Sequence, residues 1–421
     1  MVSTVDRLIN NPRSIGRPFR LVWLSVWVSS TGDGMFVTAF PLLAATLTRD
    51  PVLIAGVTIA SRLPWLFFSM VTGAIADRMD RRRLMVGADA VRFVMVGVLG
   101  VLIAIGDANI WLLYSCAFLL GTAETLHTNA GQAILPALVE AEQLMEANAR
   151  YSSAQTAAAQ FAGPALGSSL FGVAASIPFL ADAVSFAGSA AFIGALPDVH
   201  QMPPPTTRLR DDVREGLSFI RHHAALRRIA TVLALINFFY FAASSLLVLY
   251  AAQQLHSGKF VYTALFIAAA TGTVLSRWIV TWLSRRFGVV VTLTISFWTW
   301  AITMAGLAIT STPAVAIALF VFLGVGNGLW LVLNTTLRQQ LTPARLLGRM
   351  NAAYRTISWG VVPFGAAFGG LFAKAFGLRA PFIAAGVVLT LVSAFAAPLL
   401  RPIRDATPDA APDIVDADDV R

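Results

Sequence analysis

Residues 73–83 read Gly-Ala-Ile-Ala-Asp-Arg-Met-Asp-Arg-Arg-Arg, and they separate two long apolar stretches at 52–76 and 84–105. About 20 consecutive apolar residues are enough for a helix to cross a bilayer. Short loops rich in arginine are typical of the cytoplasmic side of a membrane protein. This stretch therefore predicts two transmembrane helices joined by a cytoplasmic turn.

The same alternation of apolar stretches and short polar breaks continues along the 421 residues of the chain. Apolar residues make up 57% and charged residues 13% of the chain, whereas soluble domains carry about 25% charged residues. These values disfavour a cytosolic enzyme, a disordered chain and a β-barrel. We expect an all-α membrane protein with twelve transmembrane helices, at 20–46, 52–76, 84–105, 110–134, 151–174, 177–197, 229–253, 260–284, 288–309, 313–337, 352–375 and 380–401.

The predicted helices form two groups of six, separated by a polar segment that begins with three consecutive prolines at 203–205. The rest of that segment is charged and amphipathic, which is typical of a helix lying on a membrane surface. The predicted organisation is a cytoplasmic N-terminal segment (1–19), a six-helix bundle (20–197), a cytoplasmic linker with an interfacial helix (198–228), a second six-helix bundle (229–401) and a disordered acidic tail (402–421).

The distribution of basic residues predicts the orientation in the membrane. With both termini in the cytoplasm, 23 of the 31 lysines and arginines lie on the cytoplasmic side, and four lie outside, namely Arg49, Lys259, Lys374 and Arg379. We therefore expect a multi-pass protein of a bacterial cytoplasmic (inner) membrane. The net charge of +9 does not predict nucleic-acid binding, because the basic residues lie in short loops between apolar stretches.

A weak internal repeat supports two equivalent halves. Asn148-Ala149-Arg150-Tyr151 recurs 203 residues later as Asn351-Ala352-Ala353-Tyr354. Two halves repeated in parallel are typical of secondary transporters, whose substrate path lies between the halves near the membrane midplane.

Residues 73–83 resemble the signature loop of the major facilitator superfamily, G-x-x-x-D-R-x-G-R-[RK], and Gly163-Pro164-Ala-Leu-Gly167 is similar to the G-P-x-x-G-G motif of its antiporters. Gly32-Asp33 and further short stretches resemble the branch of bacterial macrolide and multidrug efflux proteins and enterobactin exporters. Asp80 departs from the signature glycine, and Leu120 stands where many members carry an arginine tied to proton coupling. The resemblance implies alternating access, with a kink at Gly163, Pro164 and Gly167 that seals an antiporter against leak.

The signature loop contains five candidate latch residues: Gly73, Asp77, Arg78, Arg81 and Arg82. The resemblance implies that they hold the cytoplasmic ends of the second and eleventh helices together in the outward-open state. A glycine permits close approach of helices, and a carboxylate is attracted to a helix N-terminus. The alternative interpretation is an ordinary basic loop.

Asp33 lies near the middle of the first predicted helix, where a carboxylate is costly unless it is neutralised or faces a cavity. Arg62 lies near the middle of the second helix, so we expect the two to meet. A proton-coupling site and a permanent structural ion pair both fit this pattern. Asp89 and Arg92, three residues apart on the third helix, are expected to satisfy each other.

Glu124 and His127 share one face of the fourth helix and are candidates for the substrate cavity, with Glu124 also a candidate for proton coupling. The alternative for His127 is an interfacial histidine. Asn237, Phe36, Tyr240, Trp330 and Trp359 are further candidates for the cavity wall.

Together these features predict a monomeric secondary transporter, most simply a proton-coupled antiporter that exports amphipathic drugs or similar small molecules. The expected partners are a small-molecule substrate, protons and membrane lipids. No enzyme activity, cofactor or metal site is expected, because the chain has no P-loop, no H-E-x-x-H motif and one cysteine. Uptake of a nutrient, a lipid or siderophore exporter and a flippase remain alternatives.

Overall fold

The computed structural model describes residues 16–140, 143–197, 209–343, 346–396 and 398–400. The described residues are helical almost throughout and contain no strand. Helices occupy each of the twelve predicted segments within this part of the chain. Residues 1–15 of the predicted N-terminal segment and the predicted acidic tail (402–421) lie outside the described residues, and the first helix begins at Arg17, three residues before the predicted start.

The first half of the chain contains the first six predicted helices. Several of these helices start with a proline in the first turn, where the missing N–H of proline leaves no hydrogen bond unmade. Some also start after a residue whose side chain accepts a hydrogen bond from a free backbone N–H. Asp50, for example, accepts a 2.8 Å hydrogen bond from the N–H of Val52. The helices are α2 (Arg17–Leu47), α3 (Pro51–Arg78), α4 (Arg81–Ala104), α5 (Ile110–Ile134) followed by η1 (Leu135–Ala137), the run α6 (Leu144–Ala157), η3 (Ala158–Ala162) and α7 (Gly163–Val173), and α8 (Ile177–Gly194).

The second half contains the other six predicted helices. They are α10 (Ala224–Ser244) with α11 (Leu247–Gln253), the long α12 (Lys259–Ile309), α13 (Pro313–Leu341), α14 (Leu347–Gly360) with α15 (Val362–Phe376), and α16 (Ala380–Ala394). Two predicted helices fall within α12, and Gly288 separates them with a left-handed φ of 82° that interrupts the helix. The predicted break between 284 and 288 is thus confirmed.

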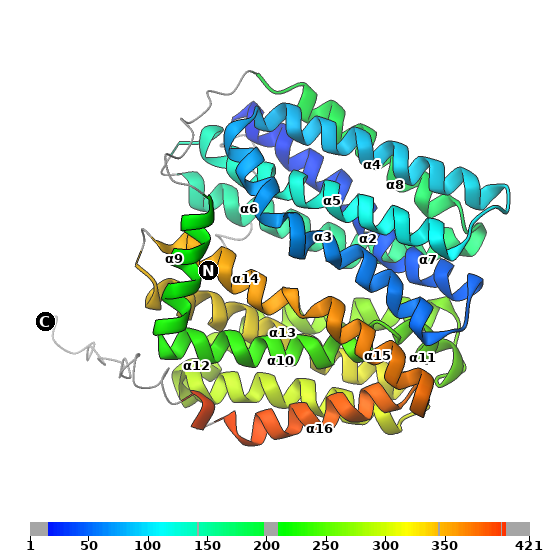
Figure 1. Cartoon of the computed structure of the whole chain (residues 1–421), viewed down its shortest axis with the longest axis vertical. Coiled ribbons are helices and arrows are strands. Elements are labelled where there is room, and N and C mark those ends of the chain that lie inside the picture. The colour runs from blue at the N-terminus through cyan, green and yellow to red at the C-terminus, as the bar shows by residue number, and fades with distance from the viewer. Residues whose placement is uncertain (1–15, 141–142, 198–208, 344–345, 397, 401–421) are drawn as a thin grey trace, which may run out of the picture.

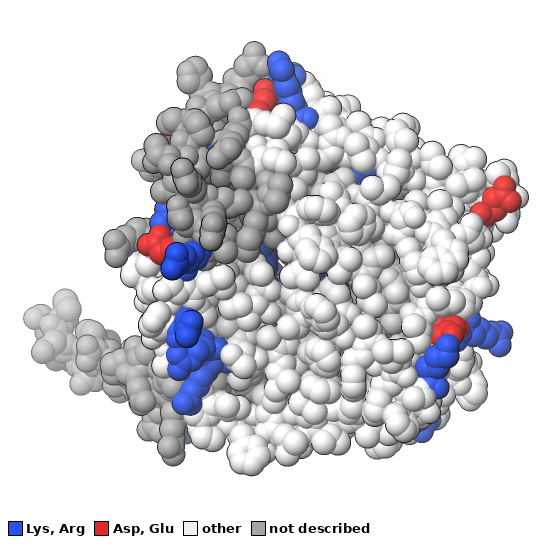
Figure 2. Space-filling view, in the orientation of Figure 1, with Lys and Arg blue, Asp and Glu red and all other residues white. Residues whose placement is uncertain are grey.

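The surface between the two ends of the molecule is apolar. Seven helical stretches of the described residues are long and apolar enough to cross a membrane, and the stretch 259–309 has the length of two crossings. Large apolar side chains point outward on both halves, among them Trp111 (67% exposed) and Trp278 (71% exposed). Figure 2 shows charged residues at the two ends and an almost uncharged belt between them. This is the surface that a bilayer covers.

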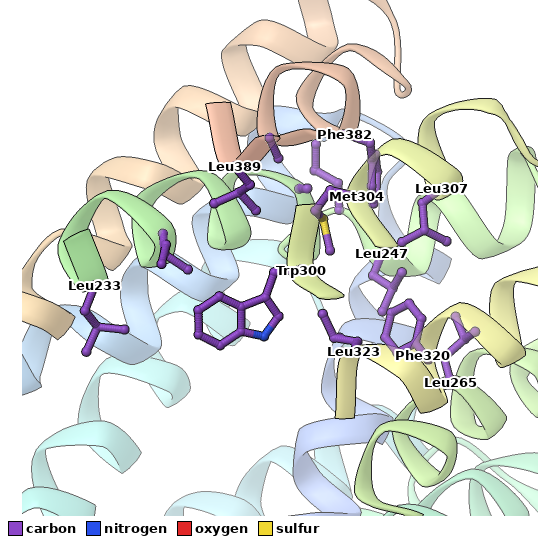
Figure 3. Close-up of a cluster of buried hydrophobic side chains, with 14 of the residues drawn as sticks. Leu233, Leu247, Leu265, Trp300, Met304, Leu307, Phe320, Leu323, Phe382 and Leu389 are labelled. Atoms are coloured by element: carbon purple, nitrogen blue, oxygen red, sulfur yellow. The ribbon is translucent and has the colours of Figure 1, made fainter. Parts of the chain in front are cut away.

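Each half has its own packed interior. In the second half, Trp300, Met304 and Leu307 of α12 pack with Phe320 and Leu323 of α13 and with Phe382 and Leu389 of α16 (Figure 3). All are buried, so this half is a close-packed bundle.

The two halves lie side by side, with α2 to α8 forming one and α10 to α16 the other (Figure 1). They contact each other through α15 against α3, α7 against α12 and α11 against α2. These contacts concentrate at one end, called here the Asp50 end, where Asp50 Oδ2 lies 2.7 Å from Lys374 Nζ. Gly370 of α15 packs there directly on Pro51 and Ala55 of α3. The opposite end is called the α9 end.

Helix α9 (Leu209–His222) lies in the segment predicted as the linker. It crosses the ends of the other helices rather than running along them, and α2 begins at the same end of the molecule (Figure 1). Gly216 packs against the backbone of Arg349 in α14, and Glu215 forms an ion pair with Arg349. The predicted interfacial helix is therefore docked on the second half.

Candidate functional site

A cavity of about 380 Å³ lies between the two halves. Helices α2, α3, α4, α5 and α8 line it from the first half, and α10, α12 and α13 line it from the second. Aromatic side chains form much of the wall, including Phe36, Phe40, Phe186, Tyr240, Tyr262 and Phe266. The cavity therefore offers a largely apolar surface to a ligand near the middle of the spanning helices.

The ionisable residues of the cavity wall come almost entirely from the first half. Asp33, Glu124 and Asp182 provide carboxyl groups, and Arg62 and Arg92 provide guanidinium groups. The side chain of Asp33 is 37% exposed, whereas that of Arg92 is 4% exposed. Asp33 is thus far more open to the cavity than its partner Arg92.

Arg92 connects the cavity to a buried polar cluster. Its guanidinium forms an ion pair with Asp33 of α2 and lies 3.4 Å from Asp89 Oδ1 on its own helix. It also lies over the ring of Phe186 in α8, 3.9 Å from the ring centre. One guanidinium therefore bridges an open carboxylate and a fully buried one.

Asp89 has several other partners. Ser189 of α8 donates a 2.6 Å hydrogen bond to Asp89 Oδ2, and His127 Nε2 of α5 lies 3.5 Å from Asp89 Oδ1. The hydroxyl of Ser25 in α2 lies 2.9 Å from that of Ser189. Because side chains of α4, α5 and α8 contact this carboxylate, Asp89 anchors the cluster, whereas Asp33 has one cation and an open side.

Asp182 on α8 is a third carboxyl group of the cluster and is 1% exposed. Its Oδ1 accepts a 3.2 Å hydrogen bond from Ser185, and its Oδ2 has no hydrogen-bond partner among the described residues. Gly32 of α2 lies so close that a Cβ there would be 2.1 Å from Asp182 Oδ1. The glycine before Asp33 therefore makes room for the carboxyl group of Asp182.

Carboxyl groups outnumber cations in this part of the molecule. Asp33, Asp89, Asp182 and Glu124 face Arg92, His127 and, on the cavity wall, Arg62. Uncompensated carboxylates are costly at membrane depth, so the cluster favours the binding of a proton or of a cationic ligand group. Within the described residues, no group of His, Cys, Asp and Glu has the arrangement of a metal site.

The partner predicted for Asp33 differs from the one observed. Arg62 lies over the ring of Trp359 in α14, 5.8 Å from its centre, and Arg92 occupies the place beside Asp33. Asp33 and Arg62 share the cavity wall without forming an ion pair. The reason is the order of the helices. Helix α2 packs closely against α8, α8 packs closely against α4, and α2 has few contacts with α3.

Four residues predicted for the cavity do not line it. Trp359 lies instead under the guanidinium of Arg62. His127 is buried against Asp89. Asn237 donates a 2.7 Å hydrogen bond to the carbonyl of Ser358. Trp330 packs on Phe297 and Trp300 in the interior of the second half. Phe36, Tyr240 and Glu124, in contrast, line the cavity as expected.

The glycines of the Gly-Pro motif bring α7 against α2. A Cβ on Gly163 would lie 2.5 Å from Gly34 Cα, and one on Gly167 would lie 2.6 Å from the Met35 carbonyl oxygen. The π-helical turn η3 directly precedes this pair, where Pro164 cannot donate a backbone hydrogen bond. The motif thus departs from regular helix geometry and permits backbone contact with the helix that carries Asp33.

The signature loop is described only in part. The side chains of Gly73, Asp77 and Arg78 lie outside the described residues. Arg82 donates a hydrogen bond to the carbonyl of Gly194, at the end of α8 in the same half. A cation at a helix C-terminus is favourable, so Arg82 has a role within the first half in this conformation.

Two members of the cluster were not identified as site residues from the sequence. The sequence predicts a structural role for Arg92, beside Asp89 or the signature loop, and Asp182 is not among the candidates drawn from it. Ionisable residues inside a membrane pair with one another, so grouping Asp33, Asp89, Arg92 and Asp182 as the intramembrane charges of one half would have pointed to both.

The chain was compared with known proteins. Residues 14–414 match the model of a family described as transmembrane secretion effector. The chain is 22% identical over 392 residues to macrolide efflux protein A of Streptococcus pyogenes, covering 92% of this chain and 96% of that protein.

Two solved structures share the fold. An inward-facing bacterial homologue of the human lysosomal transporter Spinster has a TM-score of 0.72 at 15% identity, covering 94% of this chain and 100% of that one. An inward-facing bacterial homologue of the iron transporter ferroportin has a TM-score of 0.70 at 16% identity, covering 92% and 100%. With a family model matched over most of its length and this fold, the chain belongs to the transmembrane secretion effector family of major facilitator superfamily transporters.

Proposed function

We propose that the chain is a proton-coupled antiporter that exports amphipathic small molecules by alternating access. The observation that carries the proposal is the position of Asp33. Its carboxylate is open to the cavity between the halves and pairs with Arg92, in a cluster where carboxyl groups outnumber cations. A carboxylate in this position can exchange a proton with the cavity, and its charge decides whether Arg92 stays paired with it.

The coupling follows from competition at one cluster. When Asp33 is protonated it no longer attracts Arg92, which keeps Asp89 as its partner and is free to turn toward the other carboxyl groups of the cavity. When Asp33 is ionised, it and Glu124 attract a substrate amine. A site that holds either a proton or a substrate, but binds them unequally in the two conformations, provides the linkage that antiport requires.

The substrate class follows from the cavity wall. Phe36, Phe40, Tyr240 and Phe266 offer apolar contact, while Asp33 and Glu124 offer charge. Such a wall suits a compound with a large apolar body and an amine. The resemblance to macrolide efflux protein A supports the same class and the outward direction of transport.

The proposed orientation places the α9 end and both termini in the cytoplasm of a bacterial inner membrane. The excess of arginine at that end supports it. The contacts between the halves concentrate at the Asp50 end, which is then the outer end. In this orientation the described conformation is closed to the outside.

Transport by purified protein in proteoliposomes tests the proposal. With an imposed pH gradient we expect accumulation of ethidium or erythromycin by the wild type, and at least a tenfold loss with Asp33→Asn, because the amide cannot exchange a proton. Asp107→Asn, which alters an exposed acid after α4, is the matched control and should transport normally. Gradient-driven transport by Asp33→Asn at the wild-type rate contradicts coupling through Asp33, and accumulation of a nutrient in the opposite direction contradicts export.

A further inference from the structure

A second cavity, of about 260 Å³, lies between α3 of the first half and α14 of the second. Its wall includes Arg62 and Trp65 from α3 and Arg355, Thr356 and Trp359 from α14. None of the described residues that line it is acidic. Arg62 also lines the main cavity, so the two cavities share this side chain.

The two arginines and two tryptophans form a reciprocal arrangement across the boundary between the halves. Arg62 of the first half lies over Trp359 of the second, 5.8 Å from the ring centre. Arg355 of the second half lies over Trp65 of the first, at 5.5 Å. Each half thus supplies one guanidinium, and it also supplies the aromatic ring that contacts the guanidinium of the other half.

Neither guanidinium is in direct contact with a carboxylate of the described residues, although Arg62 also lines the main cavity together with Asp33 and Glu124. Within the described residues, Arg62 and Arg355 form no ion pair and donate no hydrogen bond, and their cation–π contacts are the interactions that the structure gives them. Both lie inside helices that cross the apolar belt. A lone arginine is costly there, and the quadrupole of a ring offsets only part of that cost.

The surroundings favour an anion attached to an apolar body. Trp359, which lines this cavity, is 45% exposed. The indole N–H of Trp65 is buried and has no hydrogen-bond partner among the described residues. Two guanidinium groups and one free N–H donor match the oxygens of a phosphate or carboxylate, and the exposed ring of Trp359 matches a hydrocarbon chain.

We propose that this second cavity binds the phosphate or carboxylate of an anionic amphiphile whose chain lies in the bilayer beside α3 and α14. The anionic group can come from a membrane phospholipid or from a free anionic compound on its way to the main cavity. The chemistry of recognition is the same in both cases. The test of this site measures lipid binding and does not involve Asp33. Its failure can therefore be distinguished from a failure of the proposed proton coupling.

Native mass spectrometry of the purified full-length protein tests the proposal, with dioleoyl phosphatidylglycerol as the anionic probe and dioleoyl phosphatidylcholine as the zwitterionic one. We expect one phosphatidylglycerol to bind preferentially to the wild type. Arg62→Gln and Arg355→Gln should each weaken that binding by about tenfold, because each removes a charge-assisted contact. Arg277→Gln is the matched control, since Arg277 is an exposed arginine in a spanning stretch of α12 and lines neither cavity.

Conservative variants separate anion binding from folding. Arg62→Lys and Arg355→Lys keep the charge and should retain most of the preference, with thermal unfolding midpoints equal to those of the glutamine variants. Competition by dodecanoate identifies a free anionic compound as a second source, whereas binding of phosphatidylglycerol without competition restricts the site to lipid. Equal binding of the two lipids to the wild type, or unchanged phosphatidylglycerol binding in both glutamine variants, overturns the proposal.

Discussion

At the scale of single residues, Arg92 is the centre of the polar cluster. It is 3% exposed and forms ion pairs with both the open carboxylate of Asp33 and the buried carboxylate of Asp89. Arg62, on the wall of the same cavity, rests on a tryptophan and forms no ion pair within the described residues. Removing Arg92 therefore leaves two carboxylates without this cation, whereas removing Arg62 breaks no ion pair.

Arg92→Gln should destabilise the protein by about 3–5 kcal/mol, because removing one partner of a buried ion pair leaves an uncompensated charge. Adding Asp89→Asn to the same chain should restore part of this loss, since the amide needs no counter-ion. Thermal unfolding midpoints in detergent measure both effects, with Arg277→Gln as the control for loss of an intramembrane arginine. An Arg92→Gln midpoint equal to that of the wild type contradicts the assignment of Arg92 as the neutralising group.

Glu124 lines the main cavity and forms no hydrogen bond or ion pair within the described part of the chain. We therefore expect Glu124→Gln to reduce export of a cation such as ethidium by about tenfold, and export of a neutral compound such as chloramphenicol much less. Initial rates of efflux from cells lacking their own pumps measure the difference. Equal losses for the two compounds point to a role in coupling instead of recognition.

At the scale of elements, small residues decide how the helices of the first half approach one another. Gly163 and Gly167 are four residues apart on one face of α7, and that face meets the backbone of α2 at Gly34 and Met35. The same helix α2 carries Asp33. Packing of α7 on α2 therefore positions the carboxylate that faces the cavity.

Gly163→Ala should destabilise the first half by about 1–3 kcal/mol, because the added methyl group meets backbone atoms that cannot move aside. Gly87→Ala is the matched control, as a Cβ on this glycine in α4 would have no atom within 4 Å. It should be neutral or slightly stabilising, by up to about 1 kcal/mol, because alanine favours helix. Thermal unfolding of both variants checks the prediction, and equal midpoints for the two refute the close-contact interpretation.

At the scale of the whole molecule, the two halves are joined at the Asp50 end by the ion pair between Asp50 and Lys374. The Lys374 ammonium hydrogen-bonds Asp50 and, together with the N–H of Val52, holds the pKa of that carboxyl below its ordinary value. A lowered pKa in the closed state means that ionised Asp50 favours closure. This contribution is complete above about pH 4 and is lost as the pH falls further, through the lowered pKa.

Lys374→Gln should increase the population that is open at the Asp50 end by about two- to fivefold at neutral pH, the size expected of an exposed ion pair. Distances between spin labels at the ends of α3 and α15 measure this population. The wild type should open further as the pH falls below about 4, while Lys374→Gln should change less over the same range. Identical distance distributions at neutral pH in the two proteins contradict a role of the pair in closure.

The sequence by itself determined the membrane fold, because apolar stretches of bilayer length have no other stable place than a lipid-covered helix bundle. Gly288 marked the break inside α12, and the Gly-x-x-x-Asp-Arg loop and Gly163-Pro164 marked the superfamily. Of the cavity residues proposed from the sequence, Glu124, Phe36 and Tyr240 line the main cavity, whereas His127, Asn237, Trp330 and Trp359 do not.

Only the tertiary structure decided which charges meet. Asp33 pairs with Arg92, 59 residues away on α4, and not with Arg62 on the next helix. Arg62 and Arg355 face each other's tryptophans across the boundary between the halves. Spacing along one helix predicts neighbours on that helix alone. Contacts between helices depend instead on the order and rotation of the helices in the bundle. In the first half, close packing at Gly32, Gly163 and Gly167 sets that arrangement.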